Sequence, residues 1–300
     1  MKGFRSSNTF PLHMMLLPAV LLVLIYSYGP MIGVAISFQD FIPAKGLFGE
    51  QDWVGWDNFK YVFNMPNFMQ VIMNTITIAL FKIVLILIVP ILFSLLINEI
   101  KGKTRKKLVQ TSIYLPHFLS WVILAGILLD VLSPSTGIIN KFLSVLGIEP
   151  IFFLGDNNWF QFTIITSDIW KEFGFSTIIY LAAITGINPS YYEAAVIDGA
   201  NRYHMMRYIT LPAISYVIVL LGVLSLGNVL NAGFDQIFNL YSPQVYESGD
   251  ILDTFVYRFG LMDAQFGPAT AVGLFKSVVS FVFITVSYWI AVRFANYRIF

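Results

Sequence analysis

Long apolar stretches separated by polar segments dominate the pattern of hydrophobic and polar positions along the chain. Each stretch is long enough for a membrane-spanning helix, which needs about 20 mostly apolar residues. The stretches are continuous rather than alternating, which favours helices over the strands of a membrane barrel. The sequence therefore predicts an all-α polytopic membrane protein in which residues 1–300 form one membrane domain. The six predicted spans are residues 12–38, 70–98, 108–132, 160–187, 212–235 and 269–296.

Positively charged residues of the predicted loops fall mainly on one side of the membrane. If the N-terminus is cytoplasmic, eleven Lys and Arg residues lie in inner segments and four in outer segments. Because such residues concentrate in cytoplasmic loops, this count predicts that both termini are cytoplasmic. The longer outer loops are then residues 39–69, 133–159 and 236–268. The inner residues are Lys2, Arg5, Lys101, Lys103, Arg105, Lys106, Lys107, Arg202, Arg207, Arg293 and Arg298, and the outer ones are Lys45, Lys60, Lys141 and Arg258.

Composition agrees with a membrane protein and excludes several kinds of site. Of the 300 residues, 57% are hydrophobic and 12% are charged, and the net charge of +1 gives no overall attraction to nucleic acid. The absence of cysteine excludes disulfides, zinc–thiolate sites and cysteine nucleophiles. The nearest approach to a phosphate-binding loop, residues 222–227, is followed by Asn-Val rather than by Lys and Ser or Thr. We therefore predict no catalytic residue, no metal site and no ATPase within this chain.

The predicted inner loop 188–211 has the local chemistry of two short helices joined by a turn. Ser190 and Glu193 have the spacing of a capping box, which predicts a helix start. Gly199 offers the positive φ at which a helix can end. Pro212 is expected at the start of the fifth span, where its missing N–H is harmless. The loop is therefore predicted to form a helix, a sharp turn and a second helix at the membrane face.

This loop resembles the EAA motif of permease subunits in binding-protein-dependent ABC importers. The resemblance rests on Glu193-Ala194-Ala195, on Gly199, and on Ile209 with Leu211-Pro212. Residues 54–59 (VGWDNF), 114–116 (YLP) and 137–140 (GIIN) are similar to the maltose-permease-like (MalF/UgpA-like) branch. Residues 231–238 (NAGFDQIF) and 271–277 (AVGLFKS) are similar to LplB-type permeases of complex oligosaccharides. The resemblance covers nearly the whole chain.

The resemblance implies a MetI-like, type I ABC importer permease in a prokaryotic cell membrane. Such a subunit forms half of a translocation path for a sugar or oligosaccharide. The implied partners are a second homologous permease, two copies of a cytoplasmic ATP-binding subunit and an extracytoplasmic solute-binding lipoprotein. No cofactor is expected on this chain, because ATP and Mg belong to the partner ATPase. The residues implied in ATPase coupling are Glu193, Ala194, Ala195, Asp198, Gly199 and Arg202.

Polar residues inside the fourth and fifth predicted spans are the candidates for the substrate path. Ionisable groups in a span are costly and commonly line a cavity or pair with each other. Carboxylates, amides and hydroxyls suit sugar hydroxyls, and aromatic rings suit the apolar face of a sugar. The resemblance implies substrate contacts on these two helices. The predicted path residues are Asp168, Glu172, Phe175, Ser225, Asn228, Asn231 and Asp235.

Several of these polar residues also have a purely structural interpretation. Lys171 has Asp168 or Glu172 as possible ion-pair partners within its own helix, and Asn228 has a neighbouring helix. For Lys82 and Lys276 the sequence favours structural pairing, with Asp130 or Asp235 as candidate partners.

Two other functional classes remain as alternatives, namely an ion-coupled secondary transporter and an intramembrane enzyme or scaffold. The sequence does not identify the saccharide or its length, although the scarcity of basic residues in the spans argues against a strongly anionic cargo.

Overall fold

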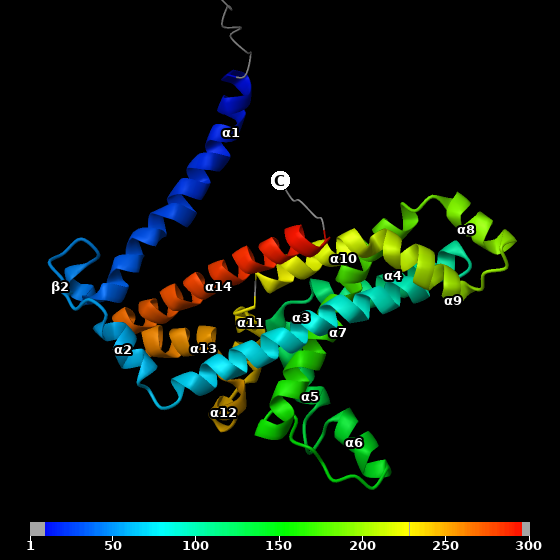
Figure 1. Ribbon diagram of the computed structural model, residues 1–300. Coiled ribbons are helices and arrows are strands. Elements are labelled where there is room, and N and C mark those ends of the chain that lie inside the picture. The colour runs from blue at the N-terminus through cyan, green and yellow to red at the C-terminus, as the bar shows by residue number, and fades with distance from the viewer. Residues whose placement is uncertain (1–9, 228, 296–300) are drawn as a thin grey trace, which may run out of the picture. The chain divides into compact units, whose positions relative to one another are not determined.

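The computed structural model describes residues 10–227 and 229–295 and is mostly helical (Figure 1). The chain forms two compact units. Unit 1 comprises residues 1–65 and 256–275, and unit 2 comprises residues 66–255 and 276–300. Among the described residues, the candidates in the fourth and fifth predicted spans and in the inner loop belong to unit 2.

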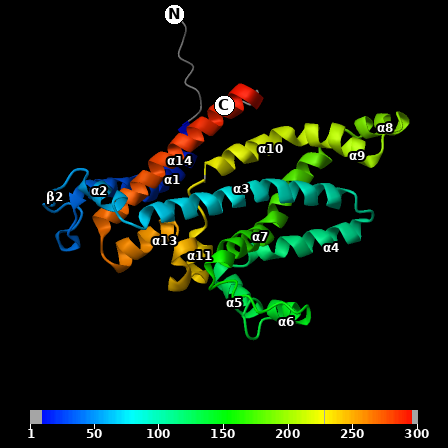
Figure 2. The ribbon, with the colours of Figure 1, turned by 60° about the horizontal axis from the view of Figure 1, so that its bottom comes forward.

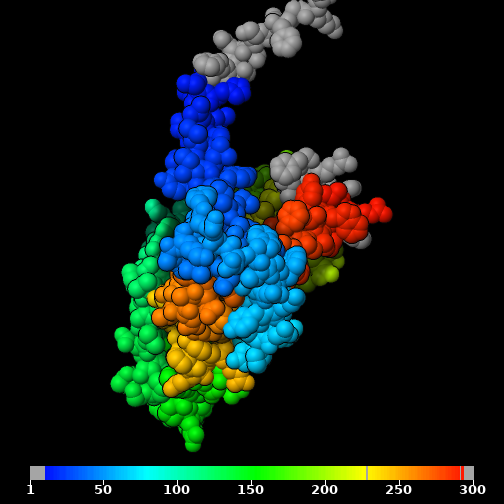
Figure 3. Space-filling model, turned by 90° about the vertical axis from the view of Figure 1, so that its left-hand side faces the viewer, coloured from blue at the N-terminus to red at the C-terminus, as the bar shows by residue number. Residues whose placement is uncertain are grey.

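Unit 1 begins with a long apolar helix and continues into a short aromatic segment. In the latter, the Phe38 ring stacks on Trp53 at 5.6 Å between centroids and meets Phe59 at 5.4 Å. Two strands pair antiparallel, with Gln39 opposite Trp53. The segments before residue 65 lie beside the segment around 256–275 (Figure 3, blue and orange). The elements are α1 (Phe10–Val23), π-helix η1 (Leu24–Tyr28), the 3₁₀ helices η2 (Gly29–Phe38) and η3 (Pro43–Lys45), β1 (Gln39–Asp40), β2 (Asp52–Trp53), α2 (Asp57–Phe63), π-helix η7 (Tyr257–Met262) and the start of α14 (Phe266–Ala295).

Unit 2 is organised around α7 (Asn157–Thr185), which packs along α3 (Phe68–Asn98) and also contacts α10 (Leu211–Leu226) (Figure 2). Apolar side chains of α7 are buried in two clusters, one around Phe160 and one around Tyr180. The other elements are α4 (Lys103–Tyr114), η4 (Leu115–Phe118), α5 (Trp121–Val131), α6 (Ile138–Val145), α8 (Pro189–Ile197), α9 (Arg202–Met205), η5 (Met206–Thr210), α11 (Phe234–Leu240), η6 (Pro243–Val245), α12 (Tyr246–Gly249) and α13 (Leu252–Val256).

The third predicted span is not one straight helix. Lys103–Phe118 and Trp121–Val131 are two helical pieces bent by 103°. Pro116 lies in the last, 3₁₀ turn of the first piece. Ser120 then has extended backbone, and its hydroxyl accepts a hydrogen bond from the Ile123 amide, which starts the second piece. The break is not evident from the sequence, because apolar residues continue on both sides of it and Ser120 is the only residue that caps the second piece.

The fifth predicted span begins earlier and ends earlier than the sequence predicts. A helical run extends over Arg202–Leu226, and within it Pro212 lies in the first turn of α10, at a helix start as predicted. The π-helical turn before the proline, in which the Leu211 amide donates to the Met206 carbonyl, accommodates the missing N–H. After Leu226 the chain leaves the helix, and α11 begins at Phe234. The predicted polar stripe 225–235 is therefore not on one continuous helix.

Among residues 10–227 and 229–295, four helices are long and apolar enough to cross a membrane, and the bent pair would be a fifth. The fourth predicted span corresponds to α7, which has the length but carries Asp168, Lys171 and Glu172. These three charges keep its hydropathy low. The four are Pro11–Phe38, Phe68–Asn98, Arg202–Leu226 and Phe266–Ile290.

Candidate functional site

A cavity of about 560 Å³ lies in unit 2 where α3 and α7 meet the end of α10. Four of the predicted path residues line it together. Asp168 and Glu172 lie one turn apart on α7, Ser225 lies near the end of α10, and Asn231 lies in the irregular segment that follows. The α3 wall contributes Lys82. Segments more than 50 residues apart in the sequence thus present carboxylate, amide and hydroxyl groups to one space.

The other predicted path residues are placed differently. Phe175 does not line the cavity, but its ring stacks on His117 at 4.2 Å between centroids. Asp235 lies in the first turn of α11 and is also absent from the cavity wall. Asn228 falls outside the described residues.

Lys82 connects three elements around the cavity. Its Nζ lies 3.3 Å from Asp168 Oδ1, and it donates hydrogen bonds to the Ala232 carbonyl at 2.8 Å and to Gln236 Oε1 at 2.5 Å. The Gln236 amide in turn donates to the Ile164 carbonyl and to Ser167 Oγ on α7. The structural pairing expected for Lys82 is confirmed. Its two candidate partners, Asp130 and Asp235, were wrong.

Glu172 is the acceptor in a second polar group. Lys171 Nζ lies 2.7 Å from Glu172 Oε1 and also donates to the His117 carbonyl, while His117 Nδ1 lies 2.7 Å from Glu172 Oε2. This pairing confirms one of the two structural options for Lys171. It also anchors the 3₁₀ turn at the bend of the third predicted span to α7.

The arrangement suits recognition of hydroxyl groups. Asp168 and Glu172 offer acceptors, while Ser225 and Asn231 can both donate and accept. No group of three or more His, Cys, Asp and Glu side chains with metal-binding geometry occurs among the residues that the structure describes. The ammonium of Lys82 is engaged by Asp168, Ala232 and Gln236. The two oxygens of Glu172 are in turn engaged by Lys171 and His117.

Three residues that take part in these polar pairings of unit 2 could not be identified from the sequence. His117 and Asp253 were not assigned a pairing from the sequence, and Gln236 was noticed only within the stretch 231–238. Asp253 is the partner of Lys276, at 2.5 Å. A lysine isolated in an apolar run signals that a partner exists, but the partner lies on another helix and the run does not identify it.

The predicted helix–turn–helix of the inner loop is present. α8 is followed by Gly199 with φ of +77°, as predicted, and α9 begins after Asn201, whose side chain accepts from the His204 amide. The capping box was wrong. The helix begins at Pro189, and Asn188 is its cap, because Asn188 Oδ1 accepts from the Ser190 amide.

Some side chains of this loop are exposed, and others bind the loop to the rest of unit 2. Tyr191, Val196 and Ile197 are 61%, 62% and 86% exposed. On the inner side the Tyr192 hydroxyl hydrogen-bonds Thr210 at 2.8 Å, and Arg202 pairs with Glu99 at the end of α3 at 2.6 Å. Figures 1 and 2 place α8 and α9 beyond the end of α10. Of the predicted coupling residues, Glu193, Ala194, Asp198, Gly199 and Arg202 are exposed and Ala195 is half-buried.

Comparison with known proteins shows extensive similarity. Residues 91–296 match the family described as binding-protein-dependent transport system inner membrane component. The chain is 41% identical over 283 residues to protein LplB of Bacillus subtilis (strain 168), covering 94% of this chain and 89% of LplB. It is also 41% identical over 285 residues to the polygalacturonan/rhamnogalacturonan transport system permease protein YteP of the same organism, covering 95% and 88%.

The fold is similar to that of a solved transporter chain. A chain in the crystal structure of a bacterial ABC transporter involved in the import of the acidic polysaccharide alginate has a TM-score of 0.88, 42% identity and 96% coverage of both chains. A second structure of the bacterial alginate transporter, in complex with an alginate pentasaccharide-bound periplasmic protein, matches with the same TM-score over 95% of both chains.

Proposed function

The chain belongs to the family of binding-protein-dependent transport system inner membrane components, and we propose that it forms half of the translocation path of an ATP-driven saccharide importer. The relatives confirm the resemblance to LplB-type permeases. They also make the chain a transporter component and not an enzyme, and they do not favour the ion-coupled alternative. The observation that carries the proposal is the shared cavity of Asp168, Glu172, Ser225 and Asn231.

In this proposal the polypeptide crosses the cytoplasmic membrane of a prokaryote six times with both termini inside. The spans are those predicted from the sequence, with the third bent and the fifth starting near Arg202. Every backbone group in hydrocarbon needs an internal partner, and a bend is tolerated where it lies within protein or lines a cavity. The bend is fixed to α7 through the Lys171–His117 contact, which supports its placement inside the protein.

Coupling to ATP hydrolysis is assigned to α8 and α9. Exposed Tyr191, Val196 and Ile197 form an apolar surface that a partner would cover, while Tyr192 and Arg202 hold the loop to the helix ends. The partner is a cytoplasmic ATPase present in two copies, which binds ATP and Mg. A second homologous permease completes the path, and a solute-binding lipoprotein delivers the cargo from outside.

We propose that the transported substrate is an oligosaccharide. Whether this oligosaccharide is neutral or acidic is what the experiment below determines. YteP is named for polygalacturonan and rhamnogalacturonan transport, and the solved neighbour imports acidic alginate. The scarcity of basic residues in the spans and the engaged ammonium of Lys82 favour a neutral oligosaccharide. Neutral and uronate-containing oligosaccharides are therefore the two arms of the test.

The test is transport by the complete importer reconstituted in vesicles with its ATPase, second permease and binding protein. Neutral xylo- and gluco-oligosaccharides and oligogalacturonates would be offered outside, with ATP inside. We expect uptake of one class to require ATP and the binding protein and to stimulate ATP hydrolysis. Uptake that proceeds without ATP and follows an ion gradient would contradict the proposal.

A further inference from the structure

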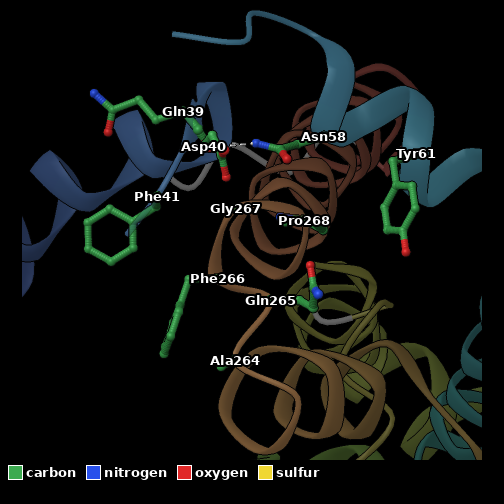
Figure 4. Close-up of a pocket in the computed structure, with 10 residues that line it drawn as sticks. All are labelled: Gln39, Asp40, Phe41, Asn58, Tyr61, Ala264, Gln265, Phe266, Gly267 and Pro268. Carbon is green, nitrogen blue, oxygen red and sulfur yellow. Dashed lines mark hydrogen bonds between the residues drawn. The ribbon is translucent and has the colours of Figure 1, made fainter. Parts of the chain in front are cut away.

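A polar pocket in unit 1 has no part in the path or the coupling loop. It measures about 380 Å³ and lies between the β1 segment, α2 and the start of α14 (Figure 4). Both parts of its wall belong to predicted outer loops, 39–69 and 236–268, or follow directly on them. The structure brings these two loops together, and the positive-residue count places both on the extracytoplasmic side.

The rear wall of the pocket is fixed by close packing. Asn58 donates hydrogen bonds to the Ser37 and Gln39 carbonyls at 3.0 and 2.9 Å. Gly267 is buried directly against this contact, because a Cβ there would lie 2.8 Å from Asn58 Nδ2. Ala264 has φ of +56°, in the left-handed region that a residue with a Cβ seldom adopts, and it precedes Gln265 at the rim. The pocket is therefore built by specific packing and is not merely a gap between loops.

The charge of the pocket is unbalanced. Asp40 is the only charged residue that lines it in the described part of the chain. Strand register places Asp40 opposite Asp52, and like charges at facing positions are destabilising. Neither carboxylate forms an ion pair with any residue between 10 and 227 or 229 and 295. A cation from outside this chain would relieve the repulsion.

The remaining lining side chains suit a planar cation. Phe41 and Phe266 meet edge to face at 6.0 Å between centroids, and Tyr61 lies on α2 at the other side. In Figure 4 the Asp40 carboxylate is directed toward the start of α14, and the Gln265 side chain extends toward the same space. A guanidinium can hydrogen-bond a carboxylate through two N–H groups and can stack on aromatic rings. A neutral sugar would bring no counter-charge, and a uronate would be repelled.

We propose that this unit 1 pocket is a docking socket for a basic side chain, preferably arginine, presented by the solute-binding protein. The proposal rests on the proposed function, since that function requires a binding protein at the outer face. The Asp40 carboxylate without an ion pair, the aromatic rings beside it and the joining of two predicted outer loops in one pocket carry it. Anchors of this kind concentrate binding energy in a few residues.

The test compares charge-reversal variants of the complete importer in nanodiscs. Asp40→Lys is the test variant, and Glu50→Lys is its matched control, because Glu50 is an exposed acid of the same loop that does not line the pocket. Binding of the cognate binding protein and the ATP hydrolysis it stimulates are measured for each. We expect Asp40→Lys to raise Kd about tenfold, Asp40→Asn to raise it less, and Glu50→Lys to change it little. Hydrolysis at saturating binding protein stays unchanged.

Exchanging the charges of Asp40 and of its basic partner on the binding protein identifies the partner residue. Replacing the matching Lys or Arg of the binding protein with Asp should restore its affinity for the Asp40→Lys importer. Equal losses in Asp40→Lys and Glu50→Lys, or an unchanged Kd in Asp40→Lys, would overturn the socket. Loss of the second permease from the purified Asp40→Lys complex would assign the pocket to that interface and also overturn it. If the unaltered importer binds no binding protein, it is the proposed function that fails.

Discussion

At the residue scale, the ammonium group of Lys82 holds the irregular segment between α10 and α11 against α7. Replacing Lys82 with Met would leave the Asp168 carboxylate without its cation and Gln236 without a donor. Breaking a buried ion pair typically destabilises by about 3–5 kcal/mol, and Asp168 is only 20% exposed. We expect Lys82→Met to lower the thermal unfolding midpoint of the purified importer and to reduce transport.

The double variant Lys82→Met with Asp168→Asn separates stability from substrate contact. It removes both charges, so we expect much of the lost thermal stability to return. Transport should stay low if Asp168 contacts the cargo. An unfolding midpoint in Lys82→Met equal to that of the unaltered importer would show that the pair does not stabilise the fold.

At the element scale, the turn between α8 and α9 depends on backbone conformation and not on space. Gly199 has φ of +77°, and a Cβ built there would meet nothing within 4 Å. A β-branched residue would still oppose this left-handed conformation, at about 1–2 kcal/mol, whereas asparagine tolerates it. We therefore expect Gly199→Val to uncouple ATP hydrolysis from the cargo and Gly199→Asn to retain most coupling. Cargo-stimulated hydrolysis and ATPase pull-down measure the two effects. Full coupled transport by Gly199→Val would show that this loop is only a connector.

Elements differ in how far the sequence could predict them, for physical reasons. The turn at Gly199 was predictable because glycine signals a local backbone requirement. The cap was assigned to Ser190 although Asn188 holds it, because both residue types cap well and sit two positions apart. The break after Leu226 was missed because the polar residues between 225 and 235 were interpreted as one stripe of a continuous span. The contact that stabilises the irregular segment comes from Lys82, about 150 positions earlier. The sequence was sufficient to predict that carboxylate, amide and hydroxyl groups line the cavity. It was not sufficient to predict which side chains pair with each other, because the pairs depend on how the helices are rotated and packed.

At the scale of the whole molecule, much apolar surface is left uncovered by this chain alone. The most apolar part of Pro11–Phe38 has no buried residues, and Leu12, Met15 and Ile25 are 58%, 79% and 61% exposed. Lipid would cover part of such a surface, and a second permease would cover the rest. The polar wall of the unit 2 cavity also needs an opposite wall if it is to enclose a saccharide, since binding sites bury most of their ligand.

We therefore expect this chain to be purified with a second, related permease in equal amounts and with two ATPase copies. Closed two-fold arrangements are the usual solution for such assemblies, and two related chains can form one pseudo-symmetrically. Native mass spectrometry of the complex extracted from membranes measures the stoichiometry directly. The control is expression of this chain with the ATPase alone, for which we expect poor recovery and no cargo-stimulated hydrolysis, because the path lacks its other half. A stable homodimer that transports cargo without a second permease would contradict the heterodimer, while leaving the cavity and the coupling loop in their proposed roles.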